Sequence, residues 1–253
     1  MNYSDMGIKE VIGIYPKIGE LLAAYGVDCA GCSVGTCLMK DVLTIHNYSE
    51  DQKRVINDQM ESIINHREID LAAIKPFETE AAKLKFSSPI QTLVDEHKNI
   101  LRLIDLAQYI IRKKTLTADL IEVTNSIIYY VRNYADKFHH AKEENILFKK
   151  TSENQDMIGV FLTEHDMGRK FIANASSGIE SGDETKVKEN ISSYIDLLRE
   201  HIHKEDKILY PWFERKLAGS GIEELGKEFD EVSRHLDANL EGALVKFLED
   251  NYA

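Results

Sequence analysis

The sequence predicts an all-α protein, an up-down-up-down four-helix bundle preceded by a small helical domain that carries the cysteines. From Ser88 onward, apolar residues recur at helical spacing over long stretches, with short polar or glycine-containing breaks between them. No alternating apolar and polar pattern of useful length points to a strand. A histidine pattern also occurs twice in this helical region, so that each long helix carries one histidine site.

The small domain is expected over residues 1–66. Within it, a helix over about 16–25 is predicted to begin at Pro16, because proline fits the first turn, and to end at Gly26, which suits a helix C-terminus. A second helix over about 49–64 starts with the capping-box motif Ser-x-x-Gln. This unit is therefore expected to be short and helical.

The region between the two domains, residues 67–87, is weakly patterned and is predicted to be a linker. Residues 88–253 are predicted to form the bundle and a C-terminal helix. The expected helices cover roughly residues 88–114, 117–150, 153–176 and 183–217 in the bundle, and 222–249 at the C-terminus.

The composition argues against several classes of partner. The 253 residues carry a formal net charge of -12, which repels phosphate backbones, so no nucleic acid is expected as a partner. No apolar run approaches the ~20 residues that span a bilayer, so no membrane association is expected. The N-terminus lacks the basic start and apolar core of a signal peptide, which predicts a cytoplasmic protein. Three closely spaced cysteines cannot form a disulfide framework for this length.

The repeated motif pairs Glu-His on one helix with His-x3-Glu on the next. In a helix, residues four apart lie on one face about 6 Å apart along the axis, so His-x3-Glu aims an imidazole and a carboxylate at one point. Two such pairs and two further histidines supply four nitrogens and two carboxylates. That set suits two bridged iron ions better than one zinc with its usual four ligands. The two copies are Glu96-His97 with His139-x3-Glu143, and Glu164-His165 with His201-x3-Glu205.

A ferritin-like carboxylate site is the competing metal scaffold. It uses Glu-x2-His on two helices and single glutamates on two others. This alternative leaves two histidines and the repeated His-x3-Glu unexplained, so we prefer the first set. The candidate ligands of the ferritin-like site would be Glu200-x2-His203, Asp136-x2-His139 with aspartate in place of glutamate, Glu96 and Glu164.

Residues 138–148, 164–166 and 201–211 resemble the hemerythrin-type HHE cation-binding domain, and the resemblance extends over roughly residues 88–250. The resemblance implies an oxo- or hydroxo-bridged pair of iron ions, with the two glutamates as bridges. His140 and His203 would then be neighbours that point elsewhere. The implied ligands are His97, His139, Glu143, His165, His201 and Glu205.

One position departs from the oxygen-carrying hemerythrins. Those proteins have a further histidine four residues after the third-helix histidine, where this chain has Arg169. One fewer ligand leaves a more open site, which resembles the di-iron proteins of iron-sulfur cluster repair. An open position suits nitric oxide, oxygen, water or peroxide.

The cysteine segment has the spacing C-x2-C-x4-C, formed by Cys29, Cys32 and Cys37. Closely spaced thiols in a reducing compartment more often do redox or metal chemistry than structural work. The preceding Tyr-Gly-x-Asp resembles the N-terminal domain of iron-sulfur repair proteins, and Cys37 departs from that pattern. Thiol–disulfide exchange, ligation of iron or a cluster with a fourth ligand from elsewhere, and incidental thiols all remain open.

The resemblance implies a stress-response protein that handles nitric oxide or oxidative damage, or donates iron, with iron-sulfur proteins or a redox partner as its partners. Glu164 would line the route to the site or hydrogen-bond a ligand imidazole. A sensor or storage module for oxygen or iron, without turnover, is the second hypothesis. A di-iron oxidoreductase that reduces nitric oxide or peroxide with the cysteine thiols is the third.

Overall fold

A computed structural model describes residues 3–27, 38–46, 48–77, 85–217, 220–235 and 239–251. The predicted all-α class is confirmed: within these ranges the elements are helical, and the one β-type pairing is an isolated antiparallel bridge between Gly7 and Leu38. None of the helices in the described ranges is long and apolar enough to cross a membrane. The chain divides into two compact units: Met1–Lys85 with Lys207–Trp212, and Phe86–Asp206 with Phe213–Ala253.

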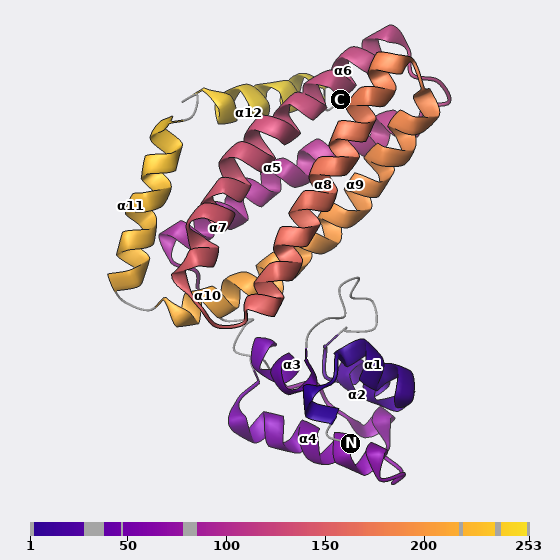
Figure 1. Cartoon of the computed structure of the whole chain (residues 1–253), viewed down its shortest axis with the longest axis vertical. Helices are drawn as coiled ribbons and strands as arrows, with labels where there is room; N and C mark the ends of the chain where they lie inside the picture. Colours follow the sequence, from indigo (N-terminus) through magenta and orange to yellow (C-terminus); the bar gives the residue numbers. More distant parts are fainter. Residues whose placement is uncertain are drawn as a thin grey trace. The chain divides into compact units, whose positions relative to one another are not determined.

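In the described part of the first unit, the α-helices are short and carry the labels α1 to α4 in Figure 1. They are α1 (Ile8–Ile14), α2 (Pro16–Ala24), α3 (Met39–Ile45) and α4 (Glu50–Ile64). Helix α2 has the expected proline in its first turn, and the chain leaves it through Gly26 at φ 90°. Helix α4 has the expected capping box, because the Ser49 side chain accepts from the Gln52 backbone and the Gln52 side chain accepts from the Ser49 backbone.

Part of the predicted linker packs into this unit. Ile69, Leu71, Ile74 and Phe77 contact its buried core. The Phe77 ring stacks on Tyr25, with a centroid separation of 5.0 Å. Residues 69–77 therefore extend the small unit beyond the expected boundary at residue 66, and residues 78–84 lie outside the described ranges.

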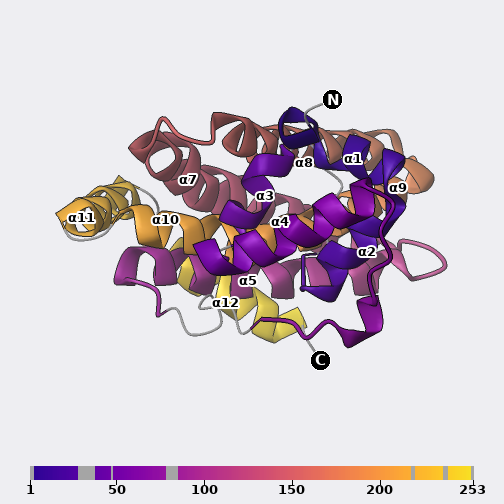
Figure 2. The same cartoon turned by 90° about the horizontal axis from the view of Figure 1, so that it is seen from below.

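In the second unit, the long helices of the described residues pack side by side as a bundle (Figures 1 and 2). Helix α8 packs on α9, and α9 packs on α5. Both α5 and α8 contact the second helix of the bundle, which consists of α6, the π-helical stretch Val131–His140 and α7. These helices bury a continuous apolar core that holds the bundle together. The elements have the bounds α5 Ser88–Ile111, α6 Ala118–Tyr130, α7 Ala141–Asn145, α8 Gln155–Ser181 and α9 Glu184–Lys204. Helix α10 (Tyr210–Lys216) follows and spans the boundary between the two units.

Two of the bundle helices contain π-helical stretches. Val131–His140 joins α6 to α7, and Glu205–Leu209 joins α9 to α10. Each stretch includes part of one His-x3-Glu motif, and π-helical turns occur frequently at functional sites. The extra residue per turn rotates the following side chains relative to an ideal α-helix, so motif spacing alone does not give their direction.

The predicted single C-terminal helix over residues 222–249 is wrong. The structure has two helices there, α11 (Ser220–His235) and α12 (Leu240–Asn251). Helix α11 packs on α5 and α7, and α12 packs on α5 (Figure 1). One straight helix over 222–249 would be about 42 Å long. The break lets both pieces bury their apolar faces against the bundle, which a straight helix would not.

Candidate metal centre

The bundle brings the six predicted ligands to one place in its core. Six helical segments contribute one residue each. They are α5, the π-helical stretch Val131–His140, α7, α8, α9 and the π-helical stretch Glu205–Leu209. None of the six side chains belongs to a residue more than 2% exposed. They are His97, His139, Glu143, His165, His201 and Glu205.

Glu205 lies between histidines of both motif copies. Its Oε2 is 3.2 Å from Nε2 of His97, which belongs to the first copy. Its Oε1 is 3.1 Å from Nε2 of His201 and 3.8 Å from Nε2 of His165, both of the second copy. A carboxylate in this position can bridge two metal ions.

Glu143 has the equivalent position. Its Oε2 is 3.7 Å from Nε2 of His139 and 3.6 Å from Nε2 of His165, one histidine from each copy. Both carboxylates therefore span the centre, and the histidines approach from either side.

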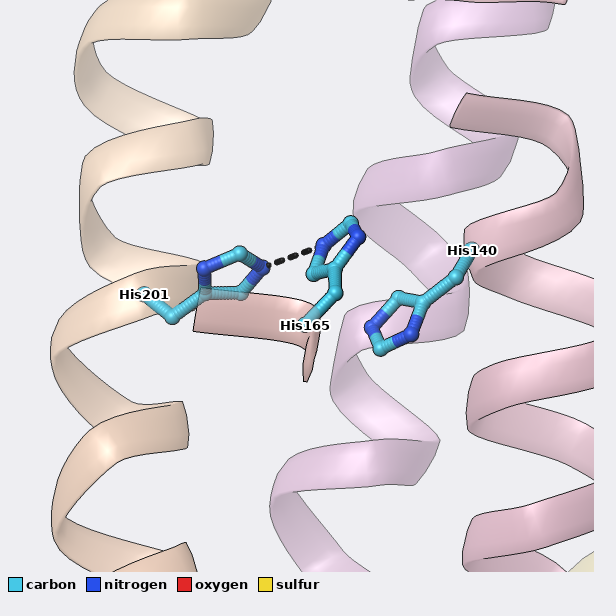
Figure 3. Close-up of side chains that lie close together, drawn as sticks. All are labelled: His140, His165 and His201. Carbon is cyan, nitrogen blue, oxygen red and sulfur yellow. Dashed lines mark hydrogen bonds between the residues drawn. The ribbon is translucent and has the colours of Figure 1, made fainter. Parts of the chain in front are cut away.

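The inward-facing donor atoms leave buried polar groups unsatisfied. Nε2 of His139 and both carboxylate oxygens of Glu205 are buried and make no hydrogen bond among the described residues. Nε2 of His165 lies 2.9 Å from Nε2 of His201, so one proton or one cation must lie between the two lone pairs (Figure 3). Because a buried carboxylate without compensation is unstable, this arrangement fits a cation at the centre.

The outward nitrogen of each of these imidazoles faces a carboxylate. A neutral imidazole that donates its Nδ1–H keeps the Nε2 lone pair for a metal, and such carboxylates orient metal-binding histidines. The four Nδ1–oxygen distances are 2.8 Å for His97–Asp206, 2.9 Å for His139–Glu96, 2.7 Å for His165–Glu144 and 2.8 Å for His201–Glu164.

Two lysines complete this outer layer. The ammonium of Lys142 hydrogen-bonds Glu96, and the ammonium of Lys204 hydrogen-bonds Glu164. Of the two roles considered for Glu164, the structure shows the hydrogen bond to a histidine, His201. The motif analysis assigned no such role to Glu96, Glu144 or Asp206, nor any to the lysines. The signal was present, since both copies continue as His-x2-Lys-Glu followed by an acidic residue.

The charges around the histidines favour a bound cation. Among the described residues, the carboxylates around the histidines outnumber the cationic side chains that pair with them, which are those of Lys142, Lys204 and Arg169. Burial lowers the pKa of His201, but the charge of Glu205 and the hydrogen bond to Glu164 outweigh it and raise that pKa to about 9. Burial raises the pKa of Glu205, but the charge of His201 and the nearby imidazoles of His165 and His97 hold it well below its usual range. Without metal, protons on the imidazoles thus balance the central carboxylate.

His140 was expected to point away from the centre. Instead, its side chain lies at the edge of the centre. Only 7% of it is exposed, and its ring stacks on that of His165 at a centroid distance of 3.8 Å (Figure 3). Burial and the charge of His165 lower its pKa to about 3, so the ring is neutral. The expectation failed because the π-helical stretch ends at His140, which turns this side chain towards α8. His203 is exposed, as expected.

A cavity of about 320 Å³ adjoins the half of the centre formed by the second motif copy, with His165 and His201. His140, His165 and His201 line one part of it, and apolar residues such as Ile172 and Leu198 line another. His97 and His139 are not among its lining residues. A small molecule in this cavity would therefore approach the His165 and His201 side.

Arg169 also lines this cavity, and acidic residues hold its side chain. Its guanidinium lies 2.8 Å from Asp136 and 2.8 Å from Asp166, and it hydrogen-bonds Glu144. Since Glu144 accepts from Nδ1 of His165, the arginine acts on the centre indirectly. It takes no ligand position.

The ferritin-like alternative is not supported by this geometry. Glu200 and His203, its clearest motif, are both exposed on α9. Glu96 and Glu164, its single ligands, are hydrogen-bonded to histidines and lysines around the centre. The predicted redox residues Cys29, Cys32 and Cys37 lie outside the described residues.

Among the described residues, three groups of donor atoms are compact enough to hold a metal ion. Within each group the donor atoms lie within 4.8 Å of one another. Imidazole nitrogens combined with carboxylate oxygens suit iron. The groups are His97–His139–Glu205, Glu143–His165–Glu205 and His140–His165–His201.

Comparison with known proteins agrees with this geometry. No curated protein and no solved structure matches the chain significantly. Residues 88–213 match the family model of the hemerythrin HHE cation binding domain. This stretch contains all six predicted ligands and the residues that hydrogen-bond them. Residues 88–213 are therefore a metal-binding domain of the hemerythrin HHE family.

Proposed function

We propose that this domain holds two iron ions in one carboxylate-bridged centre. The observation that carries the proposal is the double layer of contacts: four imidazoles face inward with Nε2 and bind carboxylates outward with Nδ1. One metal would be held by His97 and His139, and the other by His165 and His201. Glu143 and Glu205 would bridge them, because each faces histidines of both copies.

Two bridged irons supply redox chemistry and exchangeable coordination positions for small ligands. The chain's own residues determine where such a ligand can reach the centre. The cavity beside His165 and His201 provides space for it, and Arg169 pairs with carboxylates instead of completing the ligand set. We infer that nitric oxide or oxygen is the small ligand.

The physiological role that we propose is a stress response of the iron-centre repair type. The resemblance of the ligand motifs and of the segment before Cys29 to repair proteins supports this role. The centre would handle nitric oxide or oxidative damage, or donate iron, and the three cysteines would supply thiols or contact a redox or iron-sulfur partner protein.

Iron content and spectra test the first part of this proposal. The full chain, purified without oxygen, is expected to contain about two irons per chain, as six shared ligands imply. After reduction, it should bind nitric oxide within the mixing time, with a change in visible absorption. A single zinc at full occupancy, or a protein without metal after growth in iron-rich medium, would contradict the proposal.

A turnover measurement distinguishes repair or sensing from a reductase. A nitric oxide or peroxide reductase consumes its substrate continuously when a thiol-reducing system is supplied. The matched variant replaces Cys29 and Cys32 with serine. Continuous consumption that disappears in this variant would favour the reductase, and stoichiometric binding without turnover would favour the repair or sensing role.

A further inference from the structure

The two motif copies differ at one buried position beside the centre. Residues 139–148 align with residues 201–210 without a gap, and in this alignment His140 corresponds to Ile202. Both residues are buried. The second copy places an aliphatic side chain there, so bundle packing alone does not require an imidazole at position 140.

The imidazole of His140 has an unused hydrogen-bonding atom. Its Nδ1 is buried and makes no hydrogen bond among the described residues. The nearest carboxylate oxygen, Oδ1 of Asp136, is 3.5 Å away and already accepts a 2.8 Å hydrogen bond from Nε of Arg169. A contact of 3.5 Å is too long to satisfy a buried polar atom well. An additional partner is therefore expected.

The stacking geometry argues against a metal as that partner. The rings of His140 and His165 are 3.8 Å apart and inclined by only 13° (Figure 3). A metal ion lies close to the plane of the imidazole that binds it. Two nearly parallel, stacked rings do not share such a point, so His140 would have to rotate away from His165 to join it on one metal.

The cavity offers another partner. His140 lines it together with His165 and His201. A second lining residue, Tyr194, has a buried hydroxyl that makes no hydrogen bond among the described residues. Two unsatisfied polar groups in one mostly apolar cavity indicate a polar occupant. The volume of about 320 Å³ is large enough for a ligand of several atoms.

We propose that His140 is a ligand-binding residue that hydrogen-bonds a small anion or neutral molecule in the cavity, beside the His165 and His201 side of the centre. The inference rests on the proposed iron centre. The ligand class is a molecule of a few heavy atoms with a hydrogen-bond-accepting atom, which the imidazole contacts as donor.

Azide, a three-atom anion, is a suitable probe. The experiment titrates azide into the oxidised, iron-loaded full chain, follows visible absorption, and records the infrared stretch of bound azide. His140→Ile introduces the residue of the other motif copy, and His140→Gln keeps a hydrogen-bond donor. The matched control is His203→Ala, since exposed His203 corresponds to Ala141 in the first copy.

The wild type is expected to bind azide, and His140→Ile to bind it about tenfold more weakly, as the loss of one hydrogen bond to a charged ligand implies. The azide stretch should shift in the same variant. His140→Gln should recover most of the affinity, and His203→Ala should match the wild type. Iron content should be unchanged throughout.

Each other outcome overturns the inference. Unchanged azide affinity and stretch in His140→Ile would mean that His140 does not contact the ligand. Loss of iron in both His140 variants would make His140 a metal ligand instead. An iron-loaded wild type that does not bind azide would show that the cavity takes no such ligand. Absence of iron from the wild type would instead contradict the proposed function.

Discussion

The two halves of the centre have the same contacts but different surroundings. In the first half, Glu96 accepts from His139 and pairs with Lys142. In the second, Glu164 accepts from His201 and pairs with Lys204. The sequence repeat thus becomes a repeat of hydrogen bonds.

The C-terminal helices cover the first half. Helix α11 places the Phe229 ring 6.0 Å from the Lys142 ammonium, and Phe138 lies 3.5 Å from it on the other side. Helix α12 contributes Glu241, which accepts a 2.9 Å hydrogen bond from Tyr134. As a result, the Lys142 side chain is 1% exposed, whereas that of Lys204 is 11% exposed.

This difference reverses the electrostatics of two equivalent carboxylates. Burial raises the pKa of Glu96 to about 7, and the pairing with Lys142 only partly offsets it. Burial also raises the pKa of Glu164, but hydrogen bonds from His201 and Lys204 outweigh it and lower the pKa. The comparison teaches that a motif fixes the partners of a side chain, while the helices that cover it shift its pKa.

The largest effect is expected when a bridging carboxylate is removed. Glu205→Ala or Glu143→Ala should lose at least one iron and lower the melting temperature, because a ligand common to both halves disappears. Glu144→Ala should keep both irons, since Glu144 hydrogen-bonds His165 and Arg169 and is not among the six predicted ligands. Exposed Glu200→Ala is the surface control. If Glu144→Ala loses iron and Glu143→Ala does not, the assignment of the bridge is incorrect.

A matched pair of substitutions tests the difference in covering. At pH 8, above the pKa of about 7 that burial gives Glu96, Glu96→Gln should lower the free energy of unfolding by about 3 kcal/mol, because it leaves the Lys142 charge buried without an anion. Glu164→Gln should lower it by about 1.5 kcal/mol, since Lys204 reaches water. Denaturant unfolding of the two variants measures both values. Equal losses would show that the C-terminal helices do not set the two halves apart.

Arg169→Leu should have a smaller effect. Leu101 occupies the equivalent position in the first half, four residues after His97, so the substitution makes the two halves alike. The lost ion pairs are partly exposed, and the expected decrease in the free energy of unfolding is about 1 kcal/mol with unchanged iron content. Arg199→Leu, which removes a partly exposed ion pair with Asp105, is the control. Loss of iron in the Arg169 variant alone would give the arginine a role in holding metal.

The smallest effect is expected from removing the first unit. A chain that starts at Ser87 should fold and keep the iron content and spectrum of the full protein, because every clustered ligand lies beyond that residue. Iron analysis and absorption spectra of both proteins provide the comparison. A truncated protein that folds but lacks iron would mean that residues before Ser87 contribute to the centre.

The sequence predicted the parts of the fold that depend on helical spacing. The bundle helices follow from apolar periodicity, and the Ser49 capping box follows from a local motif. The doubled His-x3-Glu motif predicted which six side chains lie together, although the π-helical stretches mean that the spacing alone does not give their directions. The hydrogen-bonding carboxylates Glu96, Glu144 and Asp206 were visible in the repeat, but their partners depend on how neighbouring helices face one another.

Other features could not be read from local spacing. His140 was expected to point away, and the π-helical stretch that turns it towards His165 has no clear sequence signature. The division of the C-terminal segment into α11 and α12 depends on which part of α5 each piece covers. These outcomes reflect tertiary packing, which overrides local preference.

Anomalous diffraction at the iron edge, from crystals of the anaerobically purified full chain, tests the central claim most directly. Two peaks are expected, one beside His97 and His139 and the other beside His165 and His201, with Glu143 and Glu205 between them. A small non-protein ligand should bind only the iron beside His165 and His201, which is next to the cavity. A single peak, or two irons fully enclosed by protein side chains, would contradict this account.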